Sequence, residues 1–542
     1  MDETWLYSAR RVIHDALALV FPQRLALAQV RARWGRRGSK DALLEAAWFA
    51  RVRGQGPHVD DRTWDDLELP QVFAELDTTV TPLGSQVLYR RLRTLEDDAD
   101  ALAARHAVHL RLVDDPALRE RLQRDLLRIQ DPLHAHVADT LHAASLEPST
   151  RRGWISLWSA CLLGWLVTVV ACGLPLWWWA ALIPVNLLIL YRYSGRQQRE
   201  VAGLNGCVRL MRTADALARR PQLPMQHQLL AERPARDGVR RKLLLADMFN
   251  WVPPQVTLVL NVCFLLELIV FLWTFERFAR VRHRLHASFA LVGGLDADIA
   301  LASALVLHPQ HCAPTLADTP TLEIVDGRHP LLRDAVTNSV ALARSSALVT
   351  GSNMAGKTTF VKMLAINAIL GRTAGFCLAT RAVLPRVPVV ASIQGHHAVA
   401  SGKSHYFAQI EAIRGFLDQA ARNEGALIVL DEPFSGTNTV ERVAIAKAVL
   451  QALGERALVL VTTHDVELQA LLGARYALYH FQEDPDVDGY FDYRLRQGPA
   501  QARNAIRMLA RLGFPQDVVA EAMSVVRDTE TAHAMAPGPT PA

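Results

Sequence analysis

Eight consecutive residues in the second half of the chain have the types and spacing of a phosphate-binding loop. They are Gly351, Ser352, Asn353, Met354, Ala355, Gly356, Lys357 and Thr358, which fit the pattern G-x-x-x-x-G-K-[ST]. The glycines let the backbone turn tightly with its N–H groups pointing inward, and the start of the following helix is positively polarised. We therefore expect this loop, with Thr359, to bind ATP or GTP, with Lys357 at the β- and γ-phosphates and Thr358 on Mg²⁺.

A second set of reactive side chains follows two apolar runs that predict buried strands. Residues 426–430 lead into Asp431 and Glu432, and residues 457–463 lead into His464. We expect Asp431 to hold Mg²⁺ through its water shell and Glu432 to polarise the attacking water. His464 has the position to sense the γ-phosphate or to orient that water, although a single histidine is often only structural.

A third loop precedes a predicted helix between these stretches and contains Ser401, Gly402 and Ser404. Small hydroxyl residues at a helix start are ordinary caps. They also suit a second loop that contacts phosphate, so both interpretations stay open.

The elements that position these loops alternate between strand and helix from Leu322 onward, which predicts an α/β domain. The upstream part is different, with amphipathic helical patterns and long apolar runs. The chain has 542 residues, half of them hydrophobic, and a net charge of +5. Its length suggests about three domains.

Residues 154–172 contain no charge and, as a helix, are about 28 Å long, close to the thickness of a bilayer core. Gly173-Leu174-Pro175 predicts a turn, and residues 176–191 form a second uncharged run. Arginines lie outside both ends of the pair and none lies in the turn. We expect a transmembrane hairpin in the cell inner membrane, with both flanking parts cytoplasmic. A helical hairpin buried in a soluble core is the alternative.

A third apolar run, residues 256–275, contains Asn261 and Glu267. An ionised glutamate at the bilayer centre is costly. A third span would also put the flanking soluble parts on opposite sides of the membrane. We expect a buried or membrane-apposed helix instead.

Taken in order, these motifs resemble the MutS family of DNA-repair ATPases, which share the ABC-type ATPase core. The stretch "GSNMAGKTTF" is similar to the family's phosphate-binding loop beyond the bare pattern. The stretch "DEPFSGTNTVER" resembles the Walker B motif and the following loop of the family's shorter members. Residues 76–92 look like the start of the family's core (lever) domain, and residues 295–305 look like its return. The resemblance covers residues 65–522 approximately, interrupted by the apolar region.

The resemblance implies an α plus α/β fold, in which an all-α lever domain with the hairpin precedes an ABC-type P-loop ATPase domain. The expected order is an N-terminal helical segment (1–64), the first half of the core (65–150), the hairpin (151–200), the second half of the core (201–315), the ATPase domain (316–525) and a disordered tail (526–542). It also implies a homodimer through the ATPase domain. In such a dimer Ser401, Gly402 and Ser404 act on the partner's nucleotide.

The sequence departs from the family in ways that bear on DNA. The stretch before the core match is short for a mismatch-reading domain and contains no Phe-x-Glu wedge, and the hairpin stands where the family carries its DNA clamp. The family's acidic pair before the third loop falls on His397 and Ala398, and a glutamate of the next helix falls on Gln409. DNA is therefore a candidate partner without expected mismatch specificity.

Two other functions stay open. One is an ABC-type subunit that powers a membrane process, although two spans are few for a translocation path and no LSGGQ stretch occurs. The other is a membrane scaffold that uses the nucleotide only as a switch.

A basic run, residues 31–40, is either a phosphate-contacting patch or a solvated loop.

Overall fold

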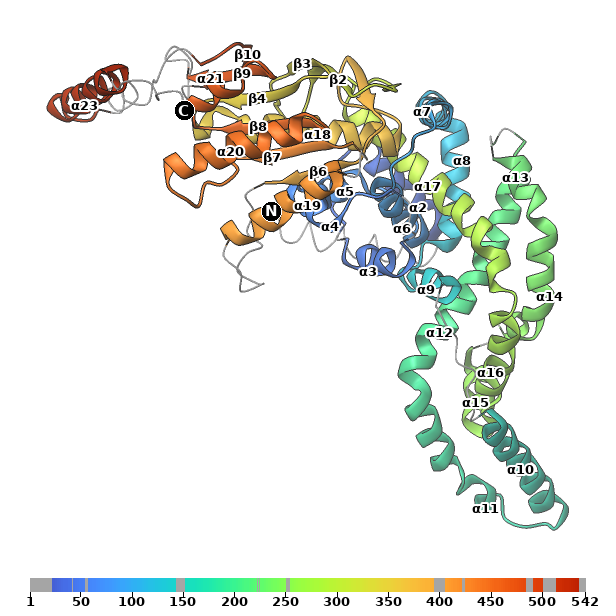
Figure 1. Ribbon diagram of the computed structural model, residues 1–542. Coiled ribbons are helices and arrows are strands. Elements are labelled where there is room, and N and C mark those ends of the chain that lie inside the picture. Colours follow the sequence, from blue (N-terminus) through green and yellow to red (C-terminus); the bar gives the residue numbers. More distant parts are fainter. Residues whose placement is uncertain are drawn as a thin grey trace, which may run out of the picture. The chain divides into compact units, whose positions relative to one another are not determined.

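A computed structural model describes residues 22–40, 42–53, 57–142, 152–221, 223, 225–249, 254–393, 405–421, 425–483, 491–500 and 513–535. The chain divides into two compact units, coloured along the sequence in Figure 1. The helical unit comprises Met1–Gly56, Gln71–Thr94 and Ala103–Pro309, and the α/β unit comprises Pro57–Pro70, Leu95–Leu102 and Gln310–Ala542. The expected combination of an α part with an α/β part is confirmed.

Amphipathic and apolar helices build the helical unit. They are α2 (Pro22–Arg33), α3 (Leu43–Val52), α5 (Leu69–Leu76), α6 (Pro82–Arg93), α7 (Ala99–Asp114), α8 (Pro116–Leu126), α9 (His136–His142), α10 (Arg152–Ala171), α11 (Trp177–Ala180), α12 (Ile183–Ala218), α13 (Gln226–Ala231), α14 (Arg233–Phe249), α15 (Pro254–Phe264), α16 (Leu266–Ala279) and α17 (His286–Leu307), with short 3-10 turns η1 (Leu127–Ile129), η2 (Pro132–Ala135) and η3 (Arg282–Leu285). Helices α5 and α7 each cross a boundary between the units.

The core of the helical unit forms where α6 packs against α17. Asp296 of α17 accepts hydrogen bonds from the backbone N–H groups of Val80 (3.0 Å) and Thr81 (2.7 Å), just before α6 begins. Gly84 is needed in the first turn of α6, because a Cβ there would lie 2.2 Å from a carboxylate oxygen of Asp296. The structure thus brings together residues 76–92 and 295–305, the two stretches that resemble the start and the return of one domain.

The basic run near the start of this unit is partly neutralised within the unit. Arg31 pairs with Glu120, Arg37 lies 2.9 Å from Glu75, and Lys40 lies 3.1 Å from Asp77. These ion pairs favour a structural role for three of its cations.

A helical hairpin extends from the helical unit and consists of α10, a turn at Gly173, α11 and the first part of α12 (Figure 1). The second uncharged run is not one helix over 176–191. It is divided after Ala180, and α12 begins again at Ile183 and continues to Ala218. Pro184 explains the division, since proline fits the first turn of a helix but not its interior.

Among the described residues, two helices are long and apolar enough to cross a membrane. Gly153–Ala171 is 22% buried, whereas Arg282–Leu307 is 78% buried and contains the core helix α17. Val256–Phe264 and Leu268–Ala279 pass the same test together, but they are bent by 80°.

Two sheets build the α/β unit. The first has the strand order β1 (Thr315–Ala317), β5 (Arg381–Pro385), β2 (Thr321–Gly327), β3 (Asn338–Ala343). The second has the order β10 (Phe491–Gln497), β9 (Tyr476–Glu483), β4 (Ser346–Thr350), β8 (Leu458–Thr463), β7 (Leu427–Asp431), β6 (Val389–Ser392). All neighbours in the second sheet are parallel except β9 and β10.

The helices of the α/β unit are α18 (Lys357–Ala374), α19 (His405–Ala421), α20 (Thr439–Gly454), α21 (Glu467–Leu472) and α23 (Gln516–Met535). Strands β4, β7 and β8 are fully buried and mostly apolar, as expected for parallel strands covered on both faces, and their polar residues lie at the strand ends. Helix α23 continues beyond residue 526, where we expected a disordered tail to begin.

A segment from the start of the chain also belongs to the α/β unit. Helix α4 (Asp61–Asp66) lies against β6, where Thr63 Oγ1 accepts the N–H of Ala391 at 3.0 Å and Asp66 accepts the N–H of Ile393 at 2.9 Å. These bonds satisfy backbone groups at the edge of the sheet. Residues 57–70 therefore group with residues 310–542, rather than with the N-terminal segment and core as we expected.

Candidate nucleotide site

Three adjacent strands place the predicted reactive residues at one edge of the sheet. Strand β8 pairs in parallel with both β4 and β7, so their carboxyl ends lie side by side. The loop that begins at Gly351 follows β4, Asp431 ends β7, and His464 follows β8. Ligands bind in such α/β sheets outside the carboxyl ends of the strands.

Both glycines of the loop are required by its backbone. Gly351 has φ 140°, and a Cβ there would lie 2.7 Å from the carbonyl oxygen of Phe481. Gly356 has φ 95° and begins α18 in a left-handed conformation that favours glycine. The loop therefore leads directly to the positively polarised start of α18.

Lys357 is buried in the middle of this edge, with 2% of its surface exposed. Its ammonium donates to the carbonyls of Gly351 (2.8 Å) and Ser352 (3.0 Å) and lies 3.5 Å from a carboxylate oxygen of Glu432. Burial lowers the pKa of Lys357, and the nearby charges of Glu432 and Asp431 oppose that shift. The lysine is thus a buried cation that lies against the phosphate-binding loop.

Glu432 has a left-handed backbone, φ 46°, and its N–H donates to the carbonyl of Thr462 at 3.1 Å. Its carboxylate pairs with Nε2 of His464. Burial alone would raise the pKa of Glu432, but the hydrogen bond and charge of His464, followed by those of Lys357, lower it. A lowered pKa keeps this carboxylate ionised at neutral pH.

His464 completes the cluster. Its Nδ1 lies 3.0 Å from the carbonyl oxygen of Gly351 and 3.3 Å from Nζ of Lys357. The structure therefore brings Lys357, Glu432 and His464 into mutual contact, although they come from three separate segments of the chain.

Thr358 and Asp431 lie together beside this cluster. The Thr358 hydroxyl lies 3.0 and 2.9 Å from the two carboxylate oxygens of Asp431, and the Thr462 hydroxyl also donates to Asp431. A hydroxyl and a carboxylate are hard oxygen ligands of the kind that Mg²⁺ prefers. These residues therefore fit a Mg²⁺ site.

The remaining predicted site residues have different outcomes. Ala355 is buried and Met354 is 72% exposed, while the side chain of Asn353 lies outside the described residues. The third predicted loop, with Ser401, Gly402 and Ser404, lies outside them altogether. Gln409, in the helix after that loop, accepts the N–H of Phe434 at 2.9 Å.

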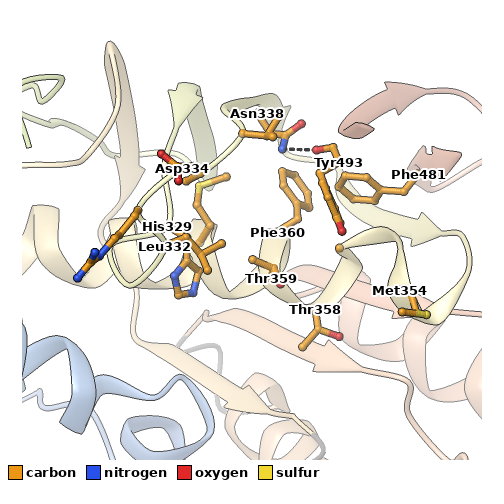
Figure 2. A pocket seen from close by; sticks show the side chains of 15 residues that line it. His329, Leu332, Asp334, Asn338, Met354, Thr358, Thr359, Phe360, Phe481 and Tyr493 are labelled. Carbon is orange, nitrogen blue, oxygen red and sulfur yellow. Dashed lines mark hydrogen bonds between the residues drawn. The ribbon is translucent and has the colours of Figure 1, made fainter. Parts of the chain in front are cut away.

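A pocket of about 520 Å³ lies beside the loop and contains aromatic side chains that we did not predict from the sequence (Figure 2). Thr358, Thr359 and Phe360 from the start of α18 line it, together with Tyr493 and Phe481 from the neighbouring strands. The rings of Phe360 and Phe481 meet edge to face, with centroids 5.7 Å apart. An apolar pocket that adjoins a phosphate-binding loop suits the flat base of a nucleotide.

The far wall of this pocket comes from the segment before β4. Asn338 donates to the carbonyl of Tyr493 at 3.0 Å and accepts the N–H of Leu495 at 2.7 Å, which joins β3 to β10. Burial lowers the pKa of His329, another lining residue, to about 4. His329 is therefore neutral at physiological pH.

Comparison with known proteins gives matches over this half of the chain. The family model described as MutS domain V matches residues 347–530. The DNA mismatch repair protein MutS of Thermus aquaticus is 34% identical over 264 residues, 48% of this chain and 32% of that protein. The MutS protein of Leuconostoc mesenteroides is 29% identical over 286 residues, 49% of this chain and 33% of that protein.

The DNA mismatch repair protein MutS 2 of Haloarcula marismortui is 29% identical over 271 residues, 44% of this chain and 28% of that protein. This chain thus spans about a third of the length of the curated relatives it matches. The matched part of the chain is thus similar to MutS domain V and to about a third of each of these relatives.

Proposed function

We propose that the chain binds and hydrolyses ATP with Mg²⁺, and that this cycle works a dimeric clamp or lever anchored to a membrane. The observation that carries the ATPase proposal is the meeting of Lys357, Glu432 and His464 beside the Thr358–Asp431 pair. The similarity to MutS domain V supports it, because Lys357, Glu432 and His464 all lie within the matched residues 347–530 and the motifs resemble those of the MutS ATPases.

Each residue has a role that its position supports. The loop N–H groups and Lys357 bind the phosphates, and a phosphate oxygen would replace the loop carbonyls as the acceptor of the Lys357 ammonium. Thr358 and Asp431 would hold Mg²⁺, which neutralises charge on the phosphates. Glu432 orients and polarises the attacking water, and His464 holds Glu432 and senses the γ-phosphate.

The pocket beside the loop would hold the base of ATP. Its position next to Thr358 and Thr359, and its aromatic lining with Tyr493, suit stacking on a purine ring.

Membrane anchorage rests on the hairpin. Its helices expose Trp154 (74%), Val167 (61%), Leu188 (65%) and Tyr191 (80%), an apolar surface of the kind that soluble monomers rarely present. The basic residues outside its ends favour both flanking parts on the cytoplasmic side of the inner membrane.

DNA is a candidate substrate because the relatives are DNA mismatch repair proteins. The hairpin in place of a clamp favours binding that is electrostatic and indifferent to a mispair.

A nucleotide-switched membrane scaffold is the second candidate. The observation that favours it is that Glu432 is engaged by both His464 and Lys357, which would hold it away from water.

A pair of substitutions separates the ATPase from the scaffold. Lys357→Ala should abolish nucleotide binding, because it removes the buried cation of the loop. Glu432→Gln should retain binding but lower turnover about 100-fold or more, since the amide cannot act as a base. If both the unsubstituted protein and Glu432→Gln bind ATP but hydrolyse it at the same rate, the ATPase proposal is wrong and the scaffold remains as the function.

A further inference from the structure

The break between α15 and α16 places polar backbone groups among apolar side chains. Leu265 has φ 54°, a left-handed conformation that ends α15, and the chain bends by 80° as α16 begins. A break of this kind frees backbone carbonyls from their helical hydrogen bonds. Leu265 is nevertheless fully buried and lies in a hydrophobic cluster with Ile155 and Leu268.

Side chains of the hairpin satisfy the freed carbonyls. The Asn186 amide of α12 donates to the carbonyls of Val262 (2.8 Å) and Cys263 (2.9 Å), and the Ser159 hydroxyl of α10 donates to that of Phe264. The Asn186 carbonyl in turn accepts from the indole N–H of Trp158 at 2.8 Å. Asn186, which is 1% exposed, thus has protein partners for both its donor and its acceptor groups.

The two capping residues lie at the same depth from the basic ends of the hairpin. At 1.5 Å per residue, Ser159 is about 10 Å along α10 from Arg152, and Asn186 is about 9 Å along α12 from Arg192. If the arginines lie at the membrane surface, the break lies about 10 Å inside. Non-helical backbone is tolerated at such depth only where protein groups satisfy it, as they do here.

The surface of the broken helix pair continues the apolar surface of the hairpin. Val256 (46%), Leu258 (64%), Val259 (59%) and Trp273 (47%) are exposed, and α15 and α16 both contact α10 (Figure 1). Lipid acyl chains are the occupant that fits this combined surface, since water would leave it unfavourably solvated.

The start of α15 and the end of α16 both lie next to α14. Helix α16 packs against α14, the helix that precedes α15, and Arg236 of α14 donates to the hydroxyl of Ser288 in α17 at 3.5 Å. Arg236 also lies 2.8 Å from Asp215. In the same helix Arg233 pairs with Asp237, and their side chains are 67% and 43% exposed, so this charged end of α14 belongs in water. Helix α15 is about 16 Å long and α16 is about 21 Å long, and both are shorter than the ~30 Å of a bilayer core.

We propose that α15 and α16 form a re-entrant segment that enters and leaves the lipid on the cytoplasmic side, with its break capped by Asn186 and Ser159. This proposal rests on the membrane anchorage proposed above. It assigns the apolar run at 256–275, which we expected to be buried or membrane-apposed, to a lipid-facing surface that does not cross the bilayer.

Single-cysteine variants of the full chain, otherwise free of cysteine, test the topology with a membrane-impermeant maleimide. Lys242→Cys and His283→Cys should label at least tenfold faster in inside-out vesicles than in spheroplasts, and Leu174→Cys should show the reverse. Val259→Cys should stay protected in both until detergent is added. Labelling of His283→Cys from outside would make the segment a span, and rapid labelling of Val259→Cys in vesicles would place it in water.

Carbonate extraction distinguishes failure of the two proposals. If carbonate releases the protein, membrane anchorage itself is wrong. If the protein is retained but Val259→Cys labels, only the re-entrant segment is wrong.

A second measurement tests the cap. In a chain that retains only Cys263, Asn186→Leu should make this thiol label at least fivefold faster, because the break loses its donors. The control, Leu188→Ala on the exposed face of the same helix, should leave the rate unchanged. Equal rates in Asn186→Leu and the unsubstituted chain would overturn the capping role of Asn186.

Discussion

Thr358 lies in hydrogen-bonding distance of both oxygens of Asp431, and this contact depends on one atom, its hydroxyl oxygen. The methyl group of the same side chain has no part in it. This separation allows the proposed Mg²⁺ role to be tested without a change in the size of the side chain.

Thr358→Val keeps the shape but removes the hydroxyl, so the Mg²⁺ concentration for half-maximal turnover should rise about tenfold or more. Thr358→Ser retains the hydroxyl and should stay close to the unsubstituted protein. A Mg²⁺ titration of ATPase activity measures both. An unchanged Mg²⁺ requirement in Thr358→Val would remove this residue from the metal site.

Tyr493 contributes a ring to the pocket, while its backbone carbonyl holds Asn338. A side-chain substitution therefore leaves the backbone bond in place. Base–aromatic stacking contributes about 1–3 kcal/mol, so Tyr493→Ala should raise KM for ATP about tenfold and leave kcat unchanged, as expected for ground-state binding. Tyr493→Phe, which keeps the ring, is the control. A lower kcat in Tyr493→Ala with an unchanged KM would contradict a base-binding role.

The reactive residues were predictable at this scale to different degrees. Gly351, Lys357 and Asp431 follow from spacing within short stretches, because the loop and the strand end are local structures. Asn338 and Tyr493 meet only after β3 and β10 are brought together, and no local pattern marks them. Likewise the ion pair of Glu432 with Lys357 depends on the order of β4, β8 and β7 in the sheet.

At the scale of elements, α6 and α17 are joined through a buried charge. Asp298 of α17 pairs with Arg91 of α6, and Nε2 of His109 lies 3.1 Å from the same carboxylate. Burial would raise the pKa of Asp298, but the charge of Arg91 and the hydrogen bond from His109 lower it to about 2. The helix pair was predictable from its resemblance to one domain, whereas the division of α12 from α11 at Pro184 needed the structure.

This shift predicts a pH dependence of stability. A carboxyl group whose pKa is lower in the folded state stabilises the fold above its unfolded pKa of about 4. That contribution, about 2 kcal/mol, is lost as the pH falls from about 4 to about 2. Asp298→Asn should therefore lower the melting temperature at pH 6, and the difference from the unsubstituted protein should shrink near pH 3.

Thermal unfolding in detergent at several pH values measures this difference. The control is Asp114→Asn, a change at an exposed position in the same unit. A difference that stays constant from pH 6 to pH 3 would show that Asp298 contributes through packing and not through its charge.

At the scale of the whole molecule, the candidate site would cover only one side of the phosphates of a bound nucleotide. Charge that develops on the γ-phosphate needs donors on the opposite side as well. Within the described part of the α/β unit, Arg442 donates to both carboxylate oxygens of Asp465, so its guanidinium is not placed to act as an arginine finger on the γ-phosphate. A second chain that supplies the loop with Gly402 and Ser404 would complete the site, as the family resemblance implies.

We therefore predict an active site that is shared between two copies of the chain, with Ser404 acting on the partner's nucleotide. Ser404→Arg chains keep the phosphate-binding loop, and Lys357→Ala chains keep the loop with Ser404. If Ser404 acts across the dimer, a mixture contains dimers with one complete site, and ATPase activity should rise above that of either variant alone. If Ser404 only caps its own helix, no mixture can assemble a complete site, and activity should remain at the level of the separate variants. Titration of one variant into the other at constant total protein measures this, with Lys357→Ala mixed with Glu432→Gln as the control, since both lesions then lie on the same side of the site and no dimer has a complete one.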